Sequence, residues 1–154
     1  SAPTRRARFF RGSMTPTLEV APSGKRILFL PFPGGHLRFH VLYDKVTQLY
    51  WLLSNQATDS MSRIESMPSL RSNLPNNERN RLALHFSRNM VDWCFAGVVA
   101  ITANEVEVRT YPSMEIDQED LLIAVRSGDR SSLDARDVAM ITMHRVRAFR
   151  KLVY

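Results

Sequence analysis

The chain has 154 residues, of which 44% are hydrophobic and 23% are charged, and its formal net charge is +6. This balance is typical of a globular protein and excludes a chain that is disordered throughout. No run of 18 apolar residues occurs, so no membrane-spanning helix is predicted. The N-terminal SAPTRRARFF lacks the apolar stretch of a signal peptide. Cys94 is the single cysteine, which excludes an internal disulfide and a cysteine metal site and fits a cytoplasmic or a trimmed secreted protein.

The basic residues are almost all arginines, since Lys25, Lys45 and Lys151 are the three lysines. They are scattered along the chain and form no basic helix or basic-aromatic motif, so we expect no nucleic-acid partner. An arginine-rich cleft that binds carboxylates or sulfates suits them equally well, because a guanidinium can grip such groups with two parallel hydrogen bonds.

Short apolar runs separated by polar turns predict strands along the whole chain. In chain order, the predicted hairpins are TPTLEVA with RILFLPF, LRFHVLY with LYWLLSN, RLALHFS with WCFAGVV, and PSMEI with LLIAVRS, followed by AMITMHRVRAFRKLVY. Asp44 and Asp117 occupy equivalent turn positions, where an aspartate can bond the backbone amides of its own turn. The pattern predicts an all-β protein.

The strands form a repeat of four, at 37–101 and again at 111–154, after a tail at 1–12 and a two-stranded piece at 13–32. Four-stranded antiparallel repeats in series are typical of β-propeller blades, so we interpret 13–154 as a single propeller-type domain. A ring with missing blades would expose sheet edges, which proteins rarely tolerate. The chain is therefore expected to be a fragment of a longer protein or to close the propeller by self-association.

The sequence SRNMVDW joins the last two strands of the first repeat. Ser87 and Asn89 can hydrogen-bond the backbone of a tight turn, and Asp92 can cap its exit. Trp93, together with Tyr50 and Trp51, is predicted to pack between blades. Asp44, Asp92 and Asp117 are assigned to turns rather than to catalysis.

Ser87-Arg88-Asn89-Met90-Val91-Asp92-Trp93, followed by Gly97, resembles the S-x-[DN]-[LM]-V-x-W-x-x-x-G turn of five-bladed propeller glycoside hydrolases. It is also similar to the looser Asp-box turns of sialidases. From about Gly12 onward the chain is similar to bacterial sialidase-family proteins. The segments that carry this likeness are GSMTPTLEVAPSGKRILFLPFPGGH, LYDKVTQLYWLLSNQATDSM, LPNNERNRLALHFSRNMVDWCFAGVVA, YPSMEIDQEDLLIAVRSGD and ITMHRVRAFRKLVY.

This resemblance implies a hydrolase of glycosidic bonds in an unidentified sugar, of which the chain holds about two and a half blades. One departure is at Arg136-Asp137-Val138-Ala139, where relatives carry a His-Asp-x-Asn-like stretch. That departure favours the alternative of a non-catalytic propeller segment that binds carbohydrate or assembles with itself.

Ligand sites of propellers lie at one end of the central axis. In this chain, the loops expected at that end are 32–38, 55–80, 102–112 and 127–138. Glycosidases need paired carboxylates, whereas sialidases use a tyrosine nucleophile and arginines that hold a substrate carboxylate. The candidate catalytic residues are Asp59, Glu78 and Tyr111, and the candidate substrate-binding residues are His36, Arg38, Arg79 and Arg126. For each of them, a solvated loop charge or a turn cap is the alternative interpretation. No metal site or cofactor is predicted.

Overall fold

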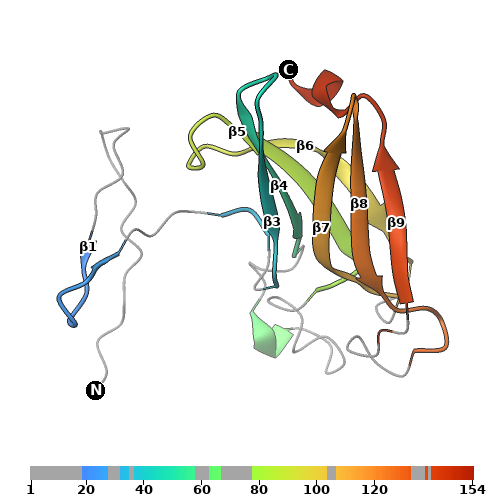
Figure 1. Ribbon diagram of the computed structural model, residues 1–154. Helices are drawn as coiled ribbons and strands as arrows, with labels where there is room; N and C mark the ends of the chain where they lie inside the picture. Colours follow the sequence, from blue (N-terminus) through green and yellow to red (C-terminus); the bar gives the residue numbers. More distant parts are fainter. Residues whose placement is uncertain are drawn as a thin grey trace. The chain divides into compact units, whose positions relative to one another are not determined.

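The computed structural model describes residues 19–27, 32–34, 37–57, 63–66, 78–103, 107–132, 138 and 140–154 (Figure 1). The chain divides into two compact units, Ser1–Pro31 and Phe32–Tyr154. All of the described regular elements are β-strands or short 3₁₀ helices, so the prediction of an all-β protein is confirmed. Neither 3₁₀ helix in this part of the chain is long and apolar enough to cross a membrane.

The first unit contains a small antiparallel hairpin formed by β1 (Glu19–Val20) and β2 (Arg26–Ile27). Gly24 lies in its turn with a φ of 76°, a conformation that glycine adopts without steric cost. The Gly24 amide donates to the Ala21 carbonyl at 2.8 Å, which closes the turn. The predicted hairpin is therefore present at its tip, and the outer parts of its two predicted strands lie outside the described residues.

The second unit begins with a four-stranded antiparallel sheet in which each strand pairs with the next one along the chain. Its strands are β3 (His40–Asp44), β4 (Leu49–Asn55), β5 (Arg81–Ser87) and β6 (Cys94–Ile101). These strands match the predicted first repeat. The loop between β4 and β5 contains a single described turn of 3₁₀ helix, η1 (Ile64–Ser66).

The second sheet has three antiparallel strands, β7 (Arg109–Asp117), β8 (Asp120–Ser127) and β9 (Met140–Val146). The fourth strand predicted for this repeat is wrong, because the chain after β9 forms the 3₁₀ helix η3 (Phe149–Leu152). Ala148 takes a left-handed conformation with a φ of 47°, which turns the backbone away from β9. Phe149 is then fully buried, so core packing outweighs the strand-like pattern of the sequence.

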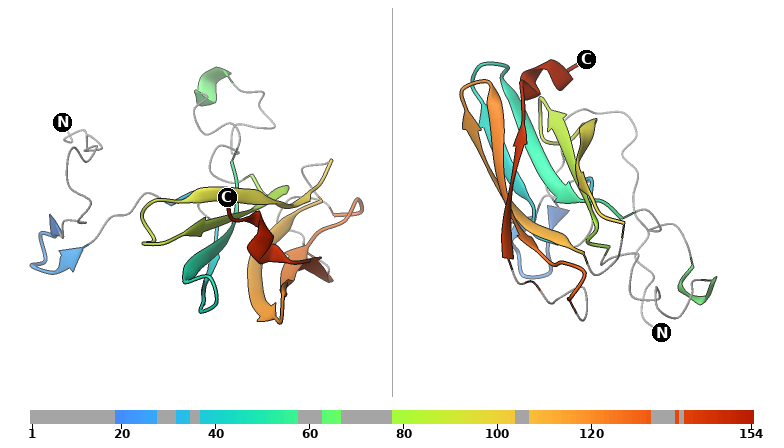
Figure 2. Two further views of the ribbon diagram at one scale, coloured as in Figure 1. Left: turned by 90° about the horizontal axis from the view of Figure 1, so that it is seen from above. Right: turned by 90° about the vertical axis from the view of Figure 1, so that its right-hand side faces the viewer.

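The two sheets pack face to face around one apolar core (Figure 2). Trp51 is completely buried, with its ring centroid 4.9 Å from that of Phe149 and 5.6 Å from that of Phe86. From the second sheet, alternate residues of β8 complete the core, because successive side chains of a strand point to opposite faces. These are Leu121, Ile123 and Val125.

The first strands of the two sheets lie beside each other along one side of this core. The Met114 amide of β7 donates to Nδ1 of His40 in β3 at 2.7 Å. Trp51 was predicted to pack between blades, and it lies in the core between the two sheets. Tyr50 instead packs its ring against Tyr43, and Trp93 against Phe32, with centroids 4.9 and 5.1 Å apart.

Candidate functional site

The loop end of the unit is the end at which β3, β5 and β7 begin and β4, β6 and β8 finish (Figure 1). The opposite end, where tight turns join β3 to β4, β5 to β6 and β7 to β8, is called the turn end. Five of the seven predicted site residues are described, and they lie at the loop end: Arg38, Glu78, Arg79, Tyr111 and Arg126.

A β-bulge near the start of β7 places Tyr111 in an unusual position. Thr110 pairs with Arg126 and Ser113 pairs with Ala124, so Tyr111 and the residue after it share a single partner position on β8. Tyr111 has a φ of 52°, in the left-handed region that non-glycine residues rarely occupy. Bulges and strained residues of this kind are concentrated at functional sites, where they re-aim a side chain.

The half-buried Tyr111 ring lies between two arginines from different elements. The guanidinium carbon of Arg38, which precedes β3, is 5.6 Å from the ring centroid, and that of Arg126 in β8 is 5.4 Å away. Both distances are within the range of cation–π attraction. We name these three residues the Arg–Tyr–Arg cluster.

The cluster concentrates positive charge at the loop end. Arg38 and Arg126 are exposed, and among the described residues neither has an ion pair. Two guanidinium groups that face one ring repel each other unless an anion lies close to both. A planar carboxylate or a sulfate fits this need, since it can accept paired hydrogen bonds from guanidinium donors. The tyrosine ring adds an aromatic surface beside that anion.

Asn55 at the end of β4 fixes the backbone next to the cluster. Its side chain is buried, and Nδ2 lies 2.6 Å from the Arg109 carbonyl, 3.2 Å from the Arg81 carbonyl and 3.3 Å from the Arg79 carbonyl. The Arg109 amide also donates to the Arg79 carbonyl at 2.9 Å. Asn55 therefore connects the first sheet to the start of β7, two residues before Tyr111. Asn55 was not among the residues predicted from the sequence, although its position as a polar residue at the end of the apolar run LYWLLSN was a signal for it.

Glu78 and Arg79 lie on the segment that leads into β5, next to the backbone hydrogen bond between the Arg109 amide and the Arg79 carbonyl. Glu78 is buried, with 6% of its surface exposed, and both residues make further polar or charged contacts. Their nearness to the start of β7 comes from the Arg79 carbonyl that binds the Arg109 amide. The other two predicted site residues, His36 and Asp59, lie outside the described residues, as does Asp137. The structure thus brings Arg38, Tyr111 and Arg126 into direct contact.

At the turn end, side chains hydrogen-bond the backbone of the tight turn between β5 and β6. Ser87 Oγ accepts from the Met90 amide at 2.9 Å, and Asn89 Oδ1 accepts from the Val91 and Asp92 amides at 2.9 Å each. Asn89 Nδ2 donates to Asp92 at 2.8 Å. The predicted turn roles of Ser87 and Asn89 are confirmed, whereas in the described part of the chain Asp92 accepts from the Asn89 side chain and not from a backbone amide.

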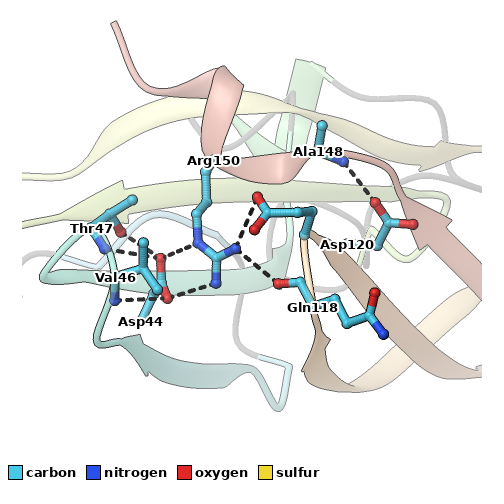
Figure 3. Close-up of polar contacts among 8 residues, drawn as sticks. Asp44, Val46, Thr47, Gln118, Asp120, Ala148 and Arg150 are labelled. Atoms are coloured by element: carbon cyan, nitrogen blue, oxygen red, sulfur yellow. Dashed lines mark hydrogen bonds and ion pairs between the residues drawn. The ribbon is translucent and has the colours of Figure 1, made fainter.

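Asp44 also has its predicted turn role, and it has a further partner (Figure 3). Its carboxylate accepts from the Val46 and Thr47 amides and forms a two-pronged ion pair with Arg150, at 2.8 and 3.0 Å. The Arg150 guanidinium is the main reason that the pKa of Asp44 lies far below its ordinary value. Asp117 differs, because its carboxylate pairs with Arg145 at 3.2 Å and no bond to its own turn is found among the described residues.

Within the described ranges, no group of three or more histidine, cysteine, aspartate or glutamate side chains could hold a metal ion. Comparisons with protein-family models, with curated proteins and with solved structures gave no match.

Proposed function

We propose that this chain is part of a β-propeller and that it binds an acidic sugar at the Arg–Tyr–Arg cluster. The observation that carries the proposal is the convergence of two exposed guanidinium groups on one strained tyrosine. A sugar acid would place its carboxylate between the guanidinium groups and its ring against the aromatic face. Such a ligand compensates the local positive charge and gains charge-assisted hydrogen bonds.

The propeller part of the proposal is supported by the two successive antiparallel sheets and by their outer faces. Each sheet buries one face in the shared core, yet large apolar side chains also lie on the other face. Phe95 and Val98 are 45% and 48% exposed on the first sheet, and Ile141 and Met143 are 63% and 66% exposed on the second. Propeller blades pack against neighbours on both faces, so this distribution of apolar residues fits a blade.

Binding can be tested by calorimetric titration of the chain with glucuronic acid, and with glucose as the neutral sugar of the same ring. We expect glucuronic acid to bind and glucose to bind at least tenfold more weakly. Arg126→Gln removes one charge-assisted partner and should weaken glucuronic acid binding roughly 10- to 100-fold. Arg88→Gln, at the exposed turn between β5 and β6, removes the same charge elsewhere and should leave the affinity unchanged.

A second candidate function is hydrolysis of a glycosidic bond, as in a sialidase-like hydrolase. It is favoured by the buried carboxyl group of Glu78 at the loop end, in the segment bonded to the start of β7. In such a hydrolase Glu78 would serve as the general acid and Tyr111 as the nucleophile. We expect Glu78→Gln to abolish release of an aryl leaving group from a susceptible glycoside. Turnover that survives both Glu78→Gln and Tyr111→Phe would eliminate this candidate.

A further inference from the structure

The second sheet presents one face to the core and the other outward. The register pairs Arg126 with Ile141, Ala124 with Met143, and Leu122 with Arg145, so each pair shares the face opposite the buried residues of β8. Ala124 and Met143 lie at the centre of this outward face, and Ile141 and Met143 are its most exposed large apolar side chains. We call it the outer face of the second sheet. It consists of Ser113, Glu115, Leu122, Ala124, Arg126, Ile141, Met143 and Arg145.

Two opposite charges flank the centre of this face. Arg126 lies toward the loop end, and Glu115, which pairs with Leu122, lies toward the turn end. Among the described residues, neither of them forms an ion pair. Arg145 is different, because Asp117 and Asp120 hold it at 3.2 and 3.1 Å. The row of Ser113, Ala124 and Met143 therefore separates one unpaired positive charge from one unpaired negative charge.

We propose that two copies of the chain pair through this outer face, where a neighbouring blade would otherwise pack, around a two-fold axis that crosses the strands at Ala124. Such an axis reverses the strand direction of the second copy. The row toward the loop end, Arg126 and Ile141, of one copy therefore covers the row toward the turn end, Glu115, Leu122 and Arg145, of the other copy. Arg126 of one copy then approaches Glu115 of the other, and the same contact occurs twice, as in any self-complementary two-fold interface. Ile141 and Met143 become buried beside these ion pairs.

This arrangement regulates the anion site, an inference that rests on the proposed function. Arg126 belongs to the Arg–Tyr–Arg cluster, so the Glu115 carboxylate of a second copy and the carboxylate of a sugar acid compete for one guanidinium. A ligand that binds only the separated copies shifts the equilibrium toward them by mass action. In the dimer the anion site is therefore blocked, and binding of an acidic ligand separates the two copies.

The test is sedimentation velocity of the 154-residue chain over a range of protein concentrations, with and without glucuronic acid. We expect a monomer–dimer equilibrium whose dissociation constant rises about tenfold in Glu115→Gln and further in Met143→Lys. Glu65→Gln, an exposed site in η1, is the matched control and should leave it unchanged. Glucuronic acid should shift the wild-type chain toward the monomer. Circular dichroism checks that each variant is folded.

A chain that is monomeric at every concentration, or a dimer that ignores both Glu115→Gln and Met143→Lys, overturns the pairing. A dimer that responds to both variants but not to bound glucuronic acid overturns the competition. If glucuronic acid fails to bind even the monomer, the proposed function fails instead, and the effects of Glu115→Gln and Met143→Lys still decide the pairing.

Discussion

At the scale of single residues, the contact between Asp44 and Arg150 connects the turn after β3 to the end of the chain. Asp44 is 2% exposed at its side chain and Arg150 is 13% exposed, so both charges lie largely out of water. Arg150 also donates to the Gln118 carbonyl at 2.8 Å and packs over the Phe149 ring. A buried ion pair of this kind is costly to break, because the remaining charge loses its partner without regaining water.

Replacing Asp44 with asparagine should therefore lower the free energy of unfolding by about 3 kcal/mol. Asp117→Asn removes the same charge from a half-exposed pair and should cost at most about 1 kcal/mol. The pKa of Asp44 is lowered on folding, so its contribution is present above the unfolded pKa, near 4, and is lost as the pH falls below it. Urea titrations between pH 7 and pH 3 should show this acid loss in the wild type and a smaller one in Asp44→Asn. Equal pH dependence in both proteins would contradict this account.

At the scale of elements, the turn between β5 and β6 shows how side chains replace missing backbone partners. Met90 has a φ of 61°, and the bonds of Ser87 and Asn89 hold it in that strained conformation. Tyr111, in the bulge at the loop end, has a similarly strained backbone. Its side chain contacts two arginines and forms no turn. One strained position thus serves the fold and the other serves the proposed site.

We expect Asn89→Ala to destabilise the protein by about 1–2 kcal/mol, because two backbone amides lose their acceptor. Arg88→Ala, at the exposed neighbouring position, should change stability by less than about 0.5 kcal/mol. Denaturant unfolding of both variants measures the difference. Equal stabilities would mean that water replaces Asn89 without cost.

At the scale of the whole molecule, the second unit depends on one core shared by its two sheets. Phe149 closes this core next to Trp51, although it comes from the segment after the last strand. The sheets should therefore unfold together rather than one after the other. The last residues of the chain pack onto this unit through Phe149 in the core and through Arg150, which pairs with Asp44. The Tyr154 hydroxyl also donates to the Phe95 carbonyl.

Phe149→Ala should lower the free energy of unfolding by about 3–5 kcal/mol, as expected for a large buried ring that leaves a cavity. Tyr154→Phe removes one exposed hydroxyl and should have an effect below about 1 kcal/mol. Tryptophan fluorescence and far-ultraviolet circular dichroism should report the same midpoint in the wild type. Separate midpoints would show that the sheets have independent cores.

The strands and the tight turns could be predicted from the sequence, because period-two alternation and residues such as Asp44, Ser87 and Asn89 are local signals. The helix η3 could not, since burial of Phe149 against a distant strand overrides a local strand-like pattern. Arg38, Tyr111 and Arg126 were predicted as candidates for one loop-end site, but not as residues in contact. Their contact depends on the bulge at Tyr111 and on the packing of two sheets, which no local pattern encodes.

Whether the Arg–Tyr–Arg cluster binds an acidic sugar can be measured by calorimetric titration of the wild type, Arg126→Gln and Arg126→Lys with glucuronic acid. We expect binding to the wild type, a roughly 10- to 100-fold loss of affinity in Arg126→Gln, and an intermediate loss in Arg126→Lys, which keeps the charge but not the two-pronged geometry. Equal binding of glucuronic acid and glucose by the wild type, or full affinity in Arg126→Gln, would contradict the proposed binding.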